Sequence, residues 1–126
     1  MSDRAWLATR KGLIELRLRG GAWQIEHTSF LGDPVSMLLP PQGGPRPQRL
    51  LAALNLGHFG AKLHASDDGG RHWQELAAPA YPPQPADAPG PAWTLRQVWC
   101  LAAAHGTVWA GTLPGGLFRS DDGGEH

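Results

Sequence analysis

The stretch HASDDGGRHW, residues 64–73, determines how the rest of this 126-residue chain is interpreted. It returns as FRSDDGGEH at residues 118–126. The step from Ser66 to Ser120 is about 54 residues, which lies within the range of units that stack into repeat architectures. The sequence therefore predicts an internal repeat whose unit ends in a turn rich in Ser, Asp and Gly.

A third, eroded copy of the unit lies at the start of the chain. Residues 5–23, AWLATRKGLIELRLRGGAW, can be aligned with residues 108–126, VWAGTLPGGLFRSDDGGEH, so that Trp6 matches Trp109. The turn of this copy keeps Gly20 and Trp23 but has no Ser or Asp. We therefore expect three related units.

The local pattern predicts strands. AWLATR, RLLAALNL and TVWAGTL are short apolar runs bounded by Gly, Pro or charged residues, as buried strands are. QVWCLAAAHG contains alanines that favour a helix, but Val98, Trp99 and the turn at His105 favour a strand. The fold class is therefore all-β, and units of about 50 residues with four short antiparallel strands are typical of β-propeller blades.

The whole chain, residues 1–126, is predicted to be a single partial β-propeller domain. Two Pro-rich segments, PPQGGPRPQ and APAYPPQPADAPGPAW, interrupt the strands. The expected divisions are part of a first blade at 1–28, a second blade at 29–77, a Pro-rich connection at 78–92 and part of a third blade at 93–126.

The repeated turn resembles the Asp-box, or BNR repeat, of the form S-x-D-x-G-x-x-W. The matching positions are Ser66, Asp68, Gly70 and Trp73 in the first copy and Ser120, Asp122 and Gly124 in the second. An Asp carboxylate accepts backbone N–H groups of a turn, and Gly adopts the positive φ that other residues resist. We expect these residues to build a hairpin and Trp73 to pack against the blade.

Catalytic or calcium-binding roles for Asp68 and Asp122 are the alternative to this structural role. D-x-D-G can open a calcium-binding EF-hand loop, but that loop needs Glu at its twelfth position, and the twelfth residue from Asp67 is Ala78. The turn chemistry therefore favours the structural role.

Strand parity places the expected ligand site away from the Asp-boxes. In a four-stranded antiparallel blade, the turn between the second and third strands shares one end with the connection to the next blade, and the Asp-box turn lies at the other end. The candidate ligand residues at the first end are Arg10, Lys11, Asp33, Asn55, His58, Phe59, Trp93 and Arg96. Cations, an imidazole, a carboxylate and aromatic rings suit a sugar or an acidic group. Each residue could instead have a purely structural role, as a solvated cation in a turn, as the cap of a loop or as an anchor for the Pro-rich connection.

Composition excludes several other classes. Eleven basic residues balance eleven acidic ones without a block of one sign, so neither nucleic acid nor a membrane is an expected partner. Cys100, the single cysteine, lies in an apolar run and is predicted to be buried. The histidines lack metal-ligand spacing, so no metal and no cofactor is expected. The start of the chain has no pattern of a leader peptide, which favours a cytoplasmic location.

A wider resemblance covers nearly the whole chain. ATRKGL, LGHFGAKLHASDDGG and GGLFRSDDGG are similar to the opening blades of WD40/YVTN/BNR-like repeat proteins and sialidase-like glycosyl hydrolases. Complete members have six or seven blades. The resemblance therefore implies an N-terminal fragment of about two and a half blades, whose partners include the remaining blades and a carbohydrate or protein ligand.

The resemblance leaves the activity open. A sialidase-like hydrolase needs an arginine cluster, a Tyr nucleophile paired with Glu, and an Asp acid/base. Arg10 and Asp33 could belong to such a set, but Tyr81 lies in the Pro-rich connection with no Glu near it in sequence, so the fragment is expected to be inactive. The alternative is a non-catalytic scaffold that binds a protein or a glycan or assists complex assembly. A third possibility is a small all-β domain whose open edges pair with another copy.

Overall fold

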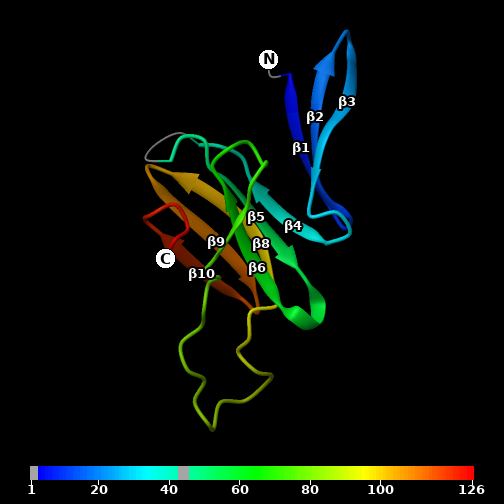
Figure 1. Cartoon of the computed structure of the whole chain (residues 1–126). Helices are drawn as coiled ribbons and strands as arrows, with labels where there is room; N and C mark the ends of the chain where they lie inside the picture. The colour runs from blue at the N-terminus through cyan, green and yellow to red at the C-terminus, as the bar shows by residue number, and fades with distance from the viewer. Residues whose placement is uncertain (1–2, 43–45) are drawn as a thin grey trace.

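The computed structural model describes residues 3–42 and 46–126, and within them it contains ten β-strands and no α-helix (Figure 1). The strands form three antiparallel sheets. The prediction of an all-β fold is confirmed. No helix in this part of the chain is long and apolar enough to cross a membrane.

Each sheet is built from strands that are consecutive in the chain. The first sheet contains β1 (Arg4–Thr9), β2 (Gly12–Arg19) and β3 (Ala22–Ser29), in that order. The second contains β4 (Val35–Leu39), β5 (Leu50–Asn55), β6 (Ala61–Ser66) and β7 (Gln74–Leu76), and a 3₁₀ turn, η1 (Gly57–Phe59), lies between β5 and β6. The third contains β8 (Gln97–Ala104), β9 (Thr107–Leu113) and β10 (Gly116–Ser120).

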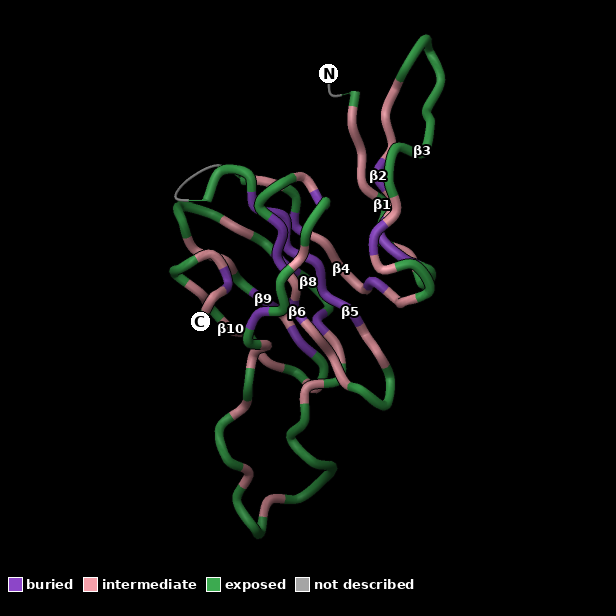
Figure 2. Tube along the Cα trace, in the orientation of Figure 1, coloured by how far each residue is buried: buried purple, intermediate pink, exposed green. Residues whose placement is uncertain are grey.

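The second sheet lies between the other two and holds the core. Leu51 and Ala53 on β5 pack in a cluster that includes residues of the third sheet. Ala52 and Leu54, which alternate with them, pack in a cluster that includes Leu13 of the first sheet. Because both faces of β5 are covered, this strand is a continuous apolar run, and Figure 2 shows buried residues concentrated in this part of the molecule.

The strand predicted over residues 97–104 is present, but Cys100 within it is exposed, so its predicted burial is wrong. The physical reason is a bulge between Val98 and Cys100, where the register of β8 against β9 shifts by one residue. Val98 and Leu101 consequently both pack into the core, and Trp99 and Cys100 both lie at the surface.

Candidate functional site

The first Asp-box turn joins β6 to β7 and is held together by one hydroxyl and one carboxylate. Ser66 Oγ accepts the Gly70 N–H at 2.9 Å. Asp68 Oδ1 accepts the Ser66 hydroxyl at 2.8 Å and the backbone N–H groups of Arg71 and His72 at 3.0 and 2.9 Å. The hydrogen bond from the His72 backbone, followed by those from the His72 and Ser66 side chains, holds the pKa of Asp68 well below its usual range.

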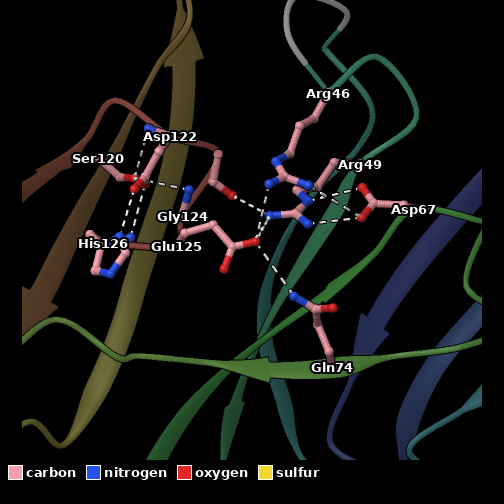
Figure 3. A network of polar contacts seen from close by, with 10 residues as sticks. Arg46, Arg49, Asp67, Gln74, Ser120, Asp122, Gly124, Glu125 and His126 are labelled. Atoms are coloured by element: carbon pink, nitrogen blue, oxygen red, sulfur yellow. Dashed lines mark hydrogen bonds and ion pairs between the residues drawn. The ribbon is translucent and has the colours of Figure 1, made fainter.

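The second Asp-box turn, which follows β10, repeats these contacts (Figure 3). Ser120 Oγ donates to Asp122 Oδ1 at 2.7 Å and accepts the Gly124 N–H at 2.9 Å. Asp122 Oδ1 also accepts the His126 backbone N–H at 2.9 Å, which lowers the Asp122 pKa. The two turns are therefore matched in detail, with each carboxylate occupied in organising its own backbone.

Trp73 links the first Asp-box to the first sheet. Its Nε1–H lies 3.0 Å from the Gly70 carbonyl oxygen and 3.1 Å from Ser29 Oγ, at the end of β3. Its ring centroid lies 4.8 Å from that of Phe30. The ring packs against the smaller of the two core clusters, as the sequence predicts, and it spans two sheets.

Arg49 connects the two Asp-box turns, and sequence reasoning missed it. Its Nε and Nη2 donate to the two carboxylate oxygens of Asp67 at 2.9 and 2.8 Å. Its Nη1 lies 3.1 Å from both the Gly123 carbonyl oxygen and Glu125 Oε1 (Figure 3). The Arg49 side chain is only 4% exposed. The available signal was an arginine directly before β5, whose first five residues are apolar, because a buried cation requires acidic partners.

The eight candidate ligand residues lie at the opposite end of the sheets (Figure 1). We call this end the loop face and define it as residues 9–12, 30–34, 55–60, 93–96 and 113–116. Arg10 and Lys11 lie in the β1–β2 turn, Asp33 before β4, Asn55 at the end of β5, His58 and Phe59 in η1, and Trp93 and Arg96 before β8.

Hydrogen bonds connect these segments into one continuous band. The Gly32 N–H donates to the Lys11 carbonyl at 3.0 Å. Asn55 donates its backbone N–H to the Pro34 carbonyl at 3.0 Å and its side-chain amide to Gln97 Oε1 at 3.4 Å. At the other end of the band, the Arg96 N–H donates to the Leu113 carbonyl at 2.8 Å. Segments from all three sheets therefore meet on the loop face.

The eight side chains are neighbours on a surface and do not form a closed polar site. Within the described residues, no hydrogen bond or ion pair joins two of them. The rings of His58 and Phe59 are in edge-to-face contact, with centroids 5.4 Å apart. Among the described residues, these eight therefore form an open surface built from several loops, and no two of them are joined by a hydrogen bond or an ion pair.

Free positive charge is concentrated on the loop face. Of the eleven Arg and Lys residues, seven make an ion pair with Asp or Glu. The four that make none with any described residue are Arg10, Lys11, Arg71 and Arg96. Three of these four lie on the loop face, with Asp33 as the carboxylate of that face, so the face carries a positive excess.

Two cavities lie elsewhere. The larger, of about 620 Å³, lies at the Asp-box end and is lined by Arg46, Arg49 and His105 among other residues. The smaller, of about 280 Å³, lies between residues 77–80 and the third sheet and is mainly apolar. Neither includes any of the eight candidate ligand residues. In the part of the chain that the structure describes, no group of three or more His, Cys, Asp or Glu residues is placed to hold a metal.

Tyr81, the one tyrosine in the sequence, has a structural contact. Its hydroxyl hydrogen-bonds to Thr112 Oγ1 at 2.7 Å and donates to the Pro114 carbonyl. Its ring meets Phe118 edge to face, with centroids 5.3 Å apart. The hydroxyl therefore fastens the Pro-rich connection to the third sheet.

No protein-family model and no curated protein matches this chain. Any assignment to a class of proteins therefore depends on the residues and geometry described above.

Proposed function

We propose that the three sheets are successive blades of an Asp-box β-propeller, with the second blade complete and the first and third represented by three strands each. The support is the match between the two Asp-box turns: each follows the third strand of its blade and uses the same Ser, Asp and Gly contacts. In this proposal β1, β2 and β3 are the second, third and fourth strands of the first blade. The Gly20–Gly21 turn between β2 and β3 then occupies the same place as the Asp-box turns.

Exposed apolar residues on the outer faces of the first and third sheets are evidence for further blades. On the first sheet, Trp23 and Ile25 are exposed, and on the third sheet Trp99, Trp109 and Leu117 are exposed. The corresponding inner faces are covered by the second sheet. Since sheets with an apolar face are stable only when that face is packed, the remaining blades of a six- or seven-bladed propeller are the proposed cover for these surfaces.

The function that we propose for this propeller is to bind a carbohydrate or another acidic ligand on the loop face. One observation carries the proposal: of the four cations that have no acidic partner among the described residues, three lie on this face. Unpaired arginine and lysine side chains retain their capacity to bind carboxylate, sulfate or phosphate groups.

Binding without turnover is favoured over glycoside hydrolysis. Retaining hydrolysis needs two suitably spaced carboxyl groups, or a tyrosine nucleophile with an acidic partner. Among the described residues, Asp33 is the acidic residue of the loop face, and the Tyr81 hydroxyl is occupied by Thr112 and Pro114. A sialidase-like activity, which the resemblance implies, is the alternative.

The test compares carboxylate probes on the full chain by isothermal titration calorimetry. The probes are 3′-sialyllactose, with lactose as its neutral control, and poly-L-glutamate. We expect the triple variant Arg10→Ala, Lys11→Ala, Arg96→Ala to weaken binding of the carboxylate probes at least about tenfold, as loss of charge-assisted hydrogen bonds requires. Arg71→Ala removes a cation without an acidic partner at the Asp-box end and should leave the affinity for the carboxylate probes unchanged. Equal effects of the two variants, or no binding of either probe, would overturn the proposal. A fluorogenic sialoside assayed in parallel tests hydrolysis.

A further inference from the structure

The loop face combines its free cations with large apolar side chains that point into solvent. Leu31 is 82% exposed and Phe59 is 76% exposed, and Trp93 and Leu113 are also exposed. Of the ten exposed large hydrophobic residues in the described chain, Leu31, Phe59 and Trp93 lie in loops of this face, and Leu113 lies at the end of β9. The other six lie in strands of the first and third sheets. Blade packing explains exposed residues on the outer faces of the sheets, and Leu113 shares the face of Trp109 on β9. It does not explain Leu31, Phe59 and Trp93, which lie in loops.

The apolar and cationic residues of the loop face are interleaved. Leu31 precedes Gly32, whose N–H is bonded to the Lys11 carbonyl. At the far side of the band, Arg96 is bonded to the Leu113 carbonyl, and Trp93 lies three residues before it. At either end of the band, backbone hydrogen bonds therefore bring a segment that carries a cation next to a segment that carries an exposed apolar residue.

This combination favours a macromolecular ligand over a small one. Small ligands are bound in concave pockets that bury most of their surface, and the two cavities described above lie away from the loop face. Exposed aromatic and arginine side chains are the residue types that supply most of the binding energy at protein interfaces.

We propose that the loop face docks an acidic polypeptide segment that also carries apolar or aromatic side chains. This inference rests on the proposed function and names the ligand class of the same surface. Carboxylates of the segment pair with Arg10, Lys11 and Arg96, and its apolar side chains pack on Leu31 and Phe59. Charge complementarity speeds association, and the apolar contacts lengthen the lifetime of the complex.

Nucleic acid fits this surface less well. Asp33 lies within the band, the chain as a whole has a formal net charge of zero, and two of the four exposed apolar residues are leucines. Nucleic-acid surfaces depend on many phosphate contacts and on base stacking against aromatic rings or arginine. A single-stranded oligonucleotide is therefore the control ligand in the test.

The test measures binding of three polymers of matched length by biolayer interferometry: poly-L-glutamate, a random copolymer of Glu and Tyr, and poly-U. We expect the Glu–Tyr copolymer to bind at least about tenfold more tightly than poly-L-glutamate, because it can use both kinds of contact. The double variant Leu31→Ser, Phe59→Ser should remove this preference without changing the binding of poly-L-glutamate. Both positions are exposed loop sites, so the substitutions should leave the fold intact, which circular dichroism and the denaturation midpoint can verify.

The outcomes separate this inference from the function on which it depends. Equal affinity for poly-L-glutamate and the Glu–Tyr copolymer, with both lost in the Arg10, Lys11 and Arg96 triple variant, overturns the polypeptide inference and leaves acidic-ligand binding in place. Tighter binding of poly-U than of either polypeptide also overturns it. If no polymer binds, or the triple variant binds as well as the parent chain, both proposals fail.

Discussion

Arg49, directly before β5, and Asp67, in the Asp-box turn that follows β6, form a two-pronged ion pair with Nε–Oδ1 and Nη2–Oδ2 distances of 2.9 and 2.8 Å. The same guanidinium reaches Gly123 and Glu125 beyond the third sheet. The hydrogen bond with Arg49 lowers the pKa of Asp67, and hydrogen bonds and charge raise the pKa of Arg49 despite its burial. One side chain therefore ties the turns of two sheets together.

We predict that Arg49→Met lowers the free energy of unfolding by about 2 kcal/mol, measured by urea denaturation. The substitution keeps the apolar stem, but it removes charge-assisted hydrogen bonds and leaves the Gly123 carbonyl without this donor. The half-exposed Asp67 regains solvent, which limits the loss.

Arg46→Met is the matched control for this prediction. Arg46 is exposed and lies 3.9 and 3.4 Å from the same two acidic groups, so we expect its loss to cost under about 0.5 kcal/mol. An equal effect of the two substitutions would show that burial of Arg49 adds nothing to the interaction.

Ser66→Ala should destabilise the chain by about 2 kcal/mol in the same assay. Ser66 is buried, and its Oγ accepts the buried Gly70 N–H while donating to Asp68. Alanine leaves that N–H without a partner in a site that excludes water. The equivalent substitution at Ser120, which is less buried, should cost less. A larger effect at Ser120 than at Ser66 would contradict this explanation.

Acid should weaken the fold through the Asp-box carboxylates. Hydrogen bonds lower the pKa values of Asp68 and Asp122 below those of the unfolded chain, which lie near about 3.9. Stability from a group with a lowered folded-state pKa is present above the unfolded pKa and is lost as the pH falls through the folded pKa. We therefore expect the urea midpoint to decrease steadily below about pH 4, with a shallower decrease in Asp68→Asn. The same slope in the variant and the parent chain would show that Asp68 is not involved.

The strands and turns of this fold could be predicted from the sequence because each depends on residues that are close together in the chain. Turn residues at fixed spacing predicted the β6–β7 hairpin around Asp68 and the matching turn at Asp122, and apolar runs predicted the strands, including residues 97–104. Strand parity placed the candidate ligand residues opposite the Asp-boxes, because parity depends only on the order of antiparallel strands.

Contacts between distant segments were not predictable in this way. Nothing near Arg49 in the sequence reveals that Glu125, 76 positions later, accepts its hydrogen bond. Cys100 was predicted to be buried because it lies in an apolar run, but a single bulge in β8 places it on the exposed face of the third sheet. The free cations of the loop face could be recognised only after every other ion pair was known.

Trp73→Phe separates the two contributions of the Asp-box tryptophan. Phenylalanine can retain the contact with Phe30 but cannot donate to the Gly70 carbonyl or to Ser29 Oγ. We expect it to cost about 1 to 2 kcal/mol, against roughly 3 to 5 kcal/mol for Trp73→Ala, which also removes the apolar ring. Equal losses in the two variants would assign the whole contribution to the indole N–H.

The bulge in β8 predicts that the single thiol, on Cys100, is accessible to reagents in the folded protein. Cys100 lies on the exposed side of the third sheet, next to Trp99, which is 57% exposed. A thiol reagent such as Ellman's reagent should therefore modify one equivalent per chain in buffer without denaturant, at a rate that urea increases only slightly. Cys100→Ser should change the unfolding free energy by less than about 0.5 kcal/mol, because substitutions at the surface disturb little packing. A thiol that reacts only after unfolding, together with a loss of several kcal/mol in Cys100→Ser, would show that Cys100 is buried in the core and would contradict the bulge in β8.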